Sequence, residues 1–145
     1  MTKTNERFGP HRVALLVGVC LTAALVVGCG KGTCSVTGKV VYDDGQQAGP
    51  ELEGYAVTFE SQNEPVSASG LIGPDGTFEV STYEPGDGAV VGRHHVTVTA
   101  PVHETDDLPP PRAIKARFES FDKSGLEVTV ESGSNEVVLT VERAE

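Results

Sequence analysis

Short runs of alternating hydrophobic and polar residues recur from residue 34 to the end of the chain. A period of two is typical of β-strands, because successive side chains point to opposite faces. Glycine and proline recur between the runs, and this part has no helical periodicity. Seven runs predict strands, at 34–42, 55–60, 67–72, 77–82, 93–100, 126–132 and 135–142. The pattern therefore predicts an all-β sandwich or barrel.

The alternation also predicts which side chains fill the core. Those expected to point inward are Val36, Val40, Tyr42, Tyr55, Val57, Phe59, Phe78, Val80, His94, Val96 and Val98. Because the period is two, His94 and His95 must point to opposite faces of their strand.

The segments between the runs predict how the strands connect. The sequence "GPDG" at 73–76 is a strong turn signal and predicts a hairpin of the third and fourth runs. The last two runs are joined by "GS", which predicts a terminal hairpin. Residues 101–124 contain four prolines and no clean period, so they predict a long excursion across the outside. We expect Ile114, Phe118 and Phe121 to order that excursion.

The N-terminal part has a different pattern. The first twelve residues carry three basic side chains and one acidic one, and residues 13–28 carry no charge. A basic start followed by an apolar stretch and small residues is typical of a cleaved secretory signal peptide. Sixteen residues are fewer than the roughly 20 that span a bilayer as a helix. A membrane span is therefore the less favoured alternative for residues 1–28.

The end of the apolar run resembles the lipobox of bacterial lipoproteins. Val26 stands three places before Cys29, and the small residue Gly28 stands directly before it. The resemblance implies that the Cys29 thiol takes a diacylglycerol and that the new N-terminus is acylated. Each buried acyl methylene contributes about 0.8 kcal/mol, so two or more chains anchor a protein stably. We therefore divide the chain into a signal peptide (1–28), a lipidated short tether (29–34) and a β-domain (35–145).

The other two cysteines have simpler interpretations. Cys20 lies inside the apolar run and leaves with the signal peptide. Cys34 is interpreted as a small apolar residue that enters the first strand. The alternative is a disulfide between Cys29 and Cys34 in a secreted chain without lipid.

Removal of residues 1–28 leaves 20 acidic and 8 basic side chains, a formal charge of −12. Binding to a phosphate backbone depends on lysine and arginine side chains that neutralise its charge. The acidic balance therefore argues against nucleic acid as a partner.

The order of the β motifs resembles the carboxypeptidase regulatory-like, or transthyretin-like, domains of short bacterial lipoproteins. The matching stretches are "VTGKVVYDDGQ", "VTFES", "GPDGTFEVST", "GDGAVVGRHHVTV" and "RFESFDKSGLEVTVESGSNEVVLTV". The resemblance implies a seven-stranded Greek-key β-sandwich with a binding or structural role and no catalysis. His94 stands where that family often has a tyrosine, and Lys115 stands where a proline is common.

The sequence offers little catalytic chemistry. The zinc-peptidase spacing H-E-x-x-H and the nucleophile elbow G-x-S-x-G are both missing. Asp43 and Asp44 before Gly45, and Asp75 before Gly76, lack the regular ligand spacing of a calcium loop and are interpreted as turns. Glu84 and Asp87 are interpreted as a solvated loop. We therefore expect no enzymatic activity and no cofactor.

One cluster of polar residues leaves a second possibility open. His103, Glu104, Asp106 and Asp107 lie close together in the sequence, with His95 at the near end of the preceding run. Nitrogen and carboxylate ligands suit a divalent metal, although such residues in a proline-rich loop are more often solvated.

Together these features predict a lipoprotein of the bacterial cell envelope, held on a membrane through acyl chains on Cys29 and facing the periplasm or the exterior. Its β-sandwich would have a structural role or bind an envelope protein or a polysaccharide. The alternative function is a small-ligand module that binds metal or carbohydrate at the cell surface.

Overall fold

The computed structural model describes residues 32–102 and 111–144, which are predominantly β. The strands are β1 (Thr33–Cys34), β2 (Val36–Tyr42), β3 (Ala56–Ser61), β4 (Ser67–Leu71), β5 (Thr77–Glu79), β6 (Ala89–Val90), β7 (Gly92–Thr99), β8 (Leu126–Val130) and β9 (Asn135–Val141). The helices are single turns, α1 (Gly49–Leu52), η2 (Ala116–Glu119) and α2 (Phe121–Ser124).

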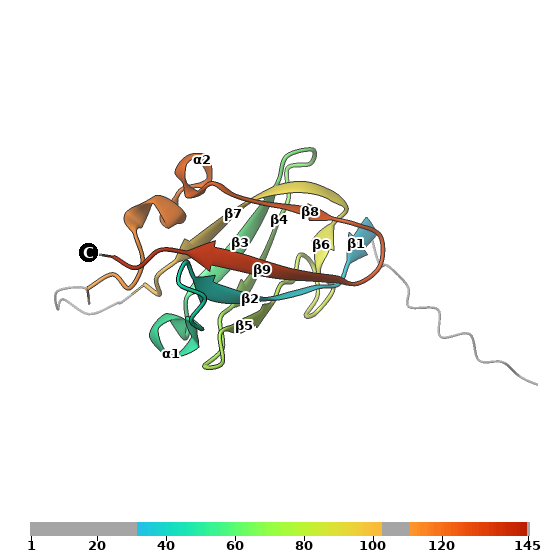
Figure 1. Cartoon of the computed structure of the whole chain (residues 1–145). Helices are drawn as coiled ribbons and strands as arrows, with labels where there is room; N and C mark the ends of the chain where they lie inside the picture. The colour runs from blue at the N-terminus through green and yellow to red at the C-terminus, as the bar shows by residue number, and fades with distance from the viewer. Residues whose placement is uncertain (1–31, 103–110, 145) are drawn as a thin grey trace, which may run out of the picture.

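Two larger sheets form the body of the protein. One contains three strands in the order β5-β2-β9, and the other contains four in the order β4-β3-β7-β8. A separate two-stranded sheet pairs β1 with β6. β9 runs parallel to β2 over seven register pairs, and the other named strand pairs are antiparallel. Figure 1 shows the strands of the two larger sheets in two layers.

The core lies between these layers and follows the alternation of the sequence. All eleven side chains that the pattern places inward are buried. Phe59 of β3 lies at the centre, with its ring centroid 6.2 Å from that of Phe78 and 6.0 Å from that of His94. Phe78 belongs to β5 of the three-stranded sheet, so its contact with Phe59 connects the two sheets, whereas His94 lies on β7, next to β3 in the same sheet.

Each of the seven predicted runs contains a strand, and two further strands were not predicted. β1 and β6 have two residues each and pair through Thr33 with Val90 and Cys34 with Ala89. A strand of two residues has no period to detect, because alternation needs at least four residues.

The predicted terminal hairpin is wrong. β8 pairs with β7 in one sheet, whereas β9 pairs with β2 in the other. The side chain of Asn135 explains the difference, because its Oδ1 accepts a bond from Glu131 N (2.9 Å) and its Nδ2 donates to Glu131 O (2.9 Å). These bonds satisfy the backbone groups of Glu131, so the turn closes without a ladder between β8 and β9.

The predicted hairpin of the third and fourth runs is present only in part. The turn at 73–76 forms, but β4 and β5 belong to different sheets. The two segments meet again at one bridge, where Ser69 and Ser81 exchange two backbone hydrogen bonds of 2.9 Å. Gly70 permits this close crossing, since a Cβ there would lie 1.9 Å from Glu79 O.

The C-terminal half of the predicted excursion is ordered as expected. Ile114 and Phe118 are buried and belong to the core cluster, and Phe121 is half-buried. η2 and α2 pack against β7. Burial of Ile114 and Phe118 therefore holds this part of the excursion against the domain.

Candidate functional site

The first strand begins close to the predicted lipid site. Cys29 lies outside the described residues, but Thr33 and Cys34 form β1 and are both buried. These two residues, assigned from the sequence to the tether, therefore pack with the domain. Four residues of extended chain reach at most about 14 Å, which limits the distance from Cys29 to Thr33.

Several segments meet at this end of the protein. Ser35 O accepts a bond from Asn135 N (2.9 Å), Gly92 pairs with Val130, and the turn after β3 bonds to the start of β7. We call this region the anchor end, after the predicted lipid site at Cys29, and define it as residues 33–35, 62–66, 82–92 and 131–135. Figure 1 shows β1 there, with α1, α2 and the C-terminus at the opposite end of the molecule.

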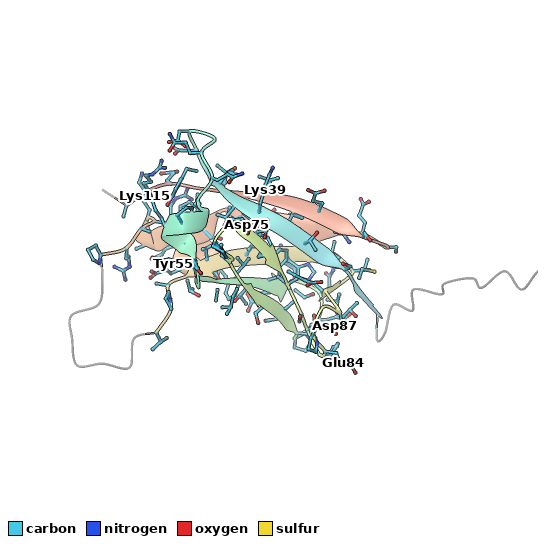
Figure 2. All side chains as sticks on the ribbon, turned by 90° about the horizontal axis from the view of Figure 1, so that it is seen from below. Lys39, Tyr55, Asp75, Glu84, Asp87 and Lys115 are labelled. Carbon is cyan, nitrogen blue, oxygen red and sulfur yellow. The ribbon has the colours of Figure 1, made fainter. Side chains whose placement is uncertain are left out.

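The loop 82–88 at the anchor end is closed by the carboxylate of Asp87. This carboxylate accepts hydrogen bonds from the backbone N–H groups of Thr82 (2.7 Å), Tyr83 (3.0 Å) and Glu84 (3.1 Å). Figure 2 shows Glu84 and Asp87 in this loop. Glu84 is exposed, as expected, whereas Asp87 has a structural role that the sequence did not indicate.

The acidic turns have the structure expected of turns. Asp44 Oδ1 accepts from Gln46 N (2.8 Å), and this hydrogen bond, followed by the one from Arg143, lowers the pKa of Asp44. Asp75 Oδ1 accepts from the hydroxyl (2.7 Å) and the N–H (3.1 Å) of Thr77, which lower the pKa of Asp75. The glycines that follow these aspartates, Gly45 and Gly76, have φ of +81° and +80°.

The proposed metal ligands are only partly described. His95 is half-buried on β7, and its Nε2 lies 3.5 Å from Glu127 Oε1. His103, Glu104, Asp106 and Asp107 lie outside the described residues, so the metal site stays a prediction. Within residues 32–102 and 111–144, no three histidine, cysteine, aspartate or glutamate side chains are placed to share a metal ion.

A polar cluster at the opposite end of the molecule from β1 was not predicted. The Tyr42 hydroxyl donates to Glu51 Oε2 (2.5 Å), and the Arg143 guanidinium lies 3.6 Å from the centroid of the Tyr42 ring. Arg143 also pairs with Asp44 at 2.7 Å. Burial and the bond to Glu51 raise the pKa of Tyr42, so the hydroxyl stays a neutral donor. The cluster of Tyr42, Asp44, Glu51 and Arg143, which we call the lock, fixes the end of β9 to the turn after β2 and has a structural role.

A second ion cluster holds η2 and the residue before it to the end of β9. Glu142 pairs with Lys115 at 2.6 Å and with Arg117 at 2.7 Å, and these bonds lower the pKa of Glu142. Arg117 also lies over the ring of Phe118. Lys115, labelled in Figure 2, is thus part of the attachment of this segment to the residue after β9.

An open cleft of about 420 Å³ lies between residues of the three-stranded sheet, the end of β4 and the turn at 73–76. It is lined by Thr37, Gly38, Lys39, Leu71, Gly73, Thr77, Phe78, Glu79 and Glu136. Lys39, labelled in Figure 2, and two glutamates supply its charges, and Leu71 is 67% exposed. Phe78 is buried, so the cleft has no exposed aromatic ring for stacking a sugar.

His94 is a buried titratable group in the core. Its Nδ1–H donates to Gly92 O (3.1 Å), and its ring meets Phe59 edge to face. Burial lowers the pKa of His94 below its usual 6.5, against the smaller opposing effect of the Gly92 bond. The folded protein therefore holds the neutral imidazole.

This burial predicts a pH-dependent stability. The unfolded chain binds a proton near pH 6.5, whereas folded His94 does so only at lower pH. The contribution of neutral His94 to the free energy of unfolding is therefore complete above pH 6.5. It is lost as the pH falls below 6.5, by at most about 1.4 kcal/mol per pH unit. Urea unfolding at several pH values down to about 5, above the usual carboxyl range, measures this slope. His94→Phe should flatten the slope and His95→Gln should not; equal slopes in all three proteins would contradict the prediction.

The sheets, core and clusters define a β-rich protein with several sheets, whose two larger layers resemble a β-sandwich. No protein-family model matches the chain, and no curated protein matches it. A crystal structure of a DUF3823 family protein from Parabacteroides merdae ATCC 43184 is similar over 76% of this chain and 46% of its own, with 21% identity and a TM-score of 0.45. The chain thus matches less than half of that protein's length, and likeness at this level carries no argument about function.

The described helices are too short to cross a bilayer. None of them in residues 32–102 and 111–144 has both the length and the apolar character of a membrane span.

Proposed function

We propose that this chain is an envelope lipoprotein that holds a non-catalytic β-sandwich at a membrane surface through acyl chains on Cys29. The observation that carries the proposal is the order of basic start, apolar run, Val26, Gly28 and Cys29 directly before a folded domain. The short distance from Cys29 to β1 supports it, because the tether brings the domain close to the lipid.

We infer that the domain is of the transthyretin-like, Greek-key class. The seven predicted runs fall on strands, and the sheet orders β5-β2-β9 and β4-β3-β7-β8 divide them between two layers, which supports this class. The role that fits such a domain is structural, or the binding of an envelope protein or polysaccharide.

A structural or binding role is also supported by how the polar groups are used. The Tyr42 hydroxyl, the Asp87 carboxylate and the Glu142 carboxylate are each engaged in bonds that hold loops or strand ends. A general base or a nucleophile needs a group that can reach a substrate. These groups instead stabilise the domain.

Substitution of Cys29 tests the anchor. We expect mass spectrometry of the full chain expressed in a bacterium to show a mature N-terminal peptide that starts at Cys29 and carries diacylglycerol and an acyl chain. Cys29→Ala should lose this mass completely, because alanine has no thiol to accept the lipid. Cys20→Ala is the matched control, since Cys20 is removed with the signal peptide, and it should keep the lipid.

Two other masses would overturn the anchor proposal. One is an unmodified peptide containing Cys29. The other is a peptide pair joined by a Cys29–Cys34 disulfide, which would identify a secreted protein without lipid.

The second candidate function is a small-ligand module, favoured by the cleft beside Lys39. The Thr37 and Thr77 hydroxyls, with Lys39, Glu79 and Glu136, offer hydrogen-bonding groups to a polar ligand. The predicted ligands around His103 offer nitrogen and carboxylate groups to a metal. Isothermal titration with zinc, copper and calcium separates the metal alternative from the structural role. Heat release with a defined stoichiometry would favour the module.

A further inference from the structure

Two exposed hydrophobic side chains lie at the anchor end. Tyr83 is 49% exposed and Val91 is 45% exposed. Val91 directly follows β6, which pairs with β1. Tyr83 belongs to the loop 82–88, and this loop touches β1, since a Cβ on Gly88 would lie 1.8 Å from Cys34 O. Both side chains are therefore carried by segments that contact the strand following the tether.

The loop that carries Tyr83 is held in one shape by its own hydrogen bonds. Besides the three bonds to Asp87, Ser81 Oγ accepts from Gly86 N (2.8 Å) and Thr82 Oγ1 donates to Gly88 O (2.7 Å). A group that is already ordered loses little conformational entropy when it binds. The backbone at Tyr83 is therefore already ordered before a partner binds, which lowers the entropic cost of docking.

The tether decides which partner this surface meets. At most about 14 Å of chain separates Cys29 from β1, so lipid on Cys29 keeps the anchor end next to the bilayer. Tethering raises the effective concentration, and a weak contact is then enough for docking. Tyrosine is enriched at the membrane–water interface because its ring is apolar and its hydroxyl is polar.

The charges of the anchor end indicate the kind of lipid. Its exposed charged side chains in the described part are Glu64, Glu84 and Glu131, and the adjacent Arg93 is paired with Glu127 at 2.8 Å. An anionic leaflet attracts basic segments and repels acidic ones. A zwitterionic surface has no such repulsion.

We propose that the anchor end docks on a zwitterionic phospholipid surface through Tyr83 and Val91, which fixes the orientation of the domain on its membrane. The proposal rests on the lipidation of Cys29. In the docked state α1, α2 and the C-terminus, at the opposite end in Figure 1, face away from the bilayer and are available to a partner.

Tryptophan fluorescence tests the docking, because the chain contains no tryptophan. The full chain is expressed as Tyr83→Trp or as the matched control Leu71→Trp. Leu71 is also exposed, at 67%, but lies at the far end of β4 from the turn at 62–66. The mature lipidated proteins are placed in vesicles of brominated phosphatidylcholine, whose bromines quench nearby tryptophan. We expect Tyr83→Trp to be quenched several-fold more strongly than Leu71→Trp and to shift its emission to the blue.

Two further arms complete the test. Adding Val91→Asp to Tyr83→Trp should remove most of the quenching, and anionic phosphatidylglycerol should weaken it at low salt. Three results would overturn the docking proposal alone. They are equal quenching of Tyr83→Trp and Leu71→Trp, no quenching of protein that floats with the vesicles, and stronger quenching on anionic vesicles. A mature chain that does not float would overturn both the anchor and the docking.

Discussion

Gly88→Ala is expected to destabilise the domain by roughly 3–5 kcal/mol. The added Cβ would lie 1.8 Å from Cys34 O and 2.8 Å from the Cα of Ser35. These are backbone atoms of β1 and of the residue that links it to β2, so the clash cannot be relieved by a side-chain rotation. Gly88 also has a φ of +81°, a conformation that disfavours residues with a Cβ.

Gly45→Ala is the matched control for this prediction. Gly45 has the same φ of +81°, but a Cβ there would have nothing within 4 Å. Its substitution should therefore cost only the backbone strain, about 1–2 kcal/mol. Urea unfolding of both variants gives the difference, which isolates the contact between loop 82–88 and β1. Equal losses for Gly45→Ala and Gly88→Ala would show that this contact does not hold β1.

Phe59→Ala should destabilise the protein by about 3–5 kcal/mol, because it leaves a cavity between the two sheets. The Phe59 side chain is fully buried, and its ring contacts reach Phe78 on β5 and His94 on β7. The loss therefore weakens the packing of both layers. Thermal or urea unfolding measures the change.

An exposed position provides the comparison for Phe59. Leu71→Ala removes a similar apolar group from a side chain that is 67% exposed, and it should change stability by no more than about 0.5 kcal/mol. If Phe59→Ala cost as little as Leu71→Ala, the core would have to lie elsewhere.

The alternation of the sequence predicts the strands and their inner faces because burial itself imposes a period of two. Val36, Phe59 and Val98 could be assigned to the core on this basis alone. The pairing partner of each strand could not be predicted in this way, because a strand has the same period of two whichever strand lies beside it. β9 pairs with β2, and the paired residues Val36 and Asn135 are 99 positions apart in the sequence. The hydrogen bonds of the Asn135 side chain that permit this pairing leave no periodic pattern in the sequence.

The candidate sites differ in the same way. The proposed lipid site at Cys29 could be predicted from the sequence because the lipobox pattern is contiguous. The lock, which includes Tyr42 and Arg143, joins residues up to 101 positions apart, so only the fold brings them together. The exposure of Tyr83 and Val91 next to β1 was invisible for the same reason, since it depends on the pairing of β1 with β6.

The parallel pairing of β2 with β9 has a mechanical consequence for the anchor proposed at Cys29. Because the two strands run in the same direction, the start of β2 and the end of β9 lie at opposite ends of the sheet. A force applied between Cys29 and the C-terminus therefore pulls the strands past each other and loads all seven register pairs in shear. Forced unfolding is governed by the unfolding rate, and bonds that must break together resist it better than bonds that open one by one. β2 and β9 are thus the strands best placed to carry tension applied between the two ends of the chain.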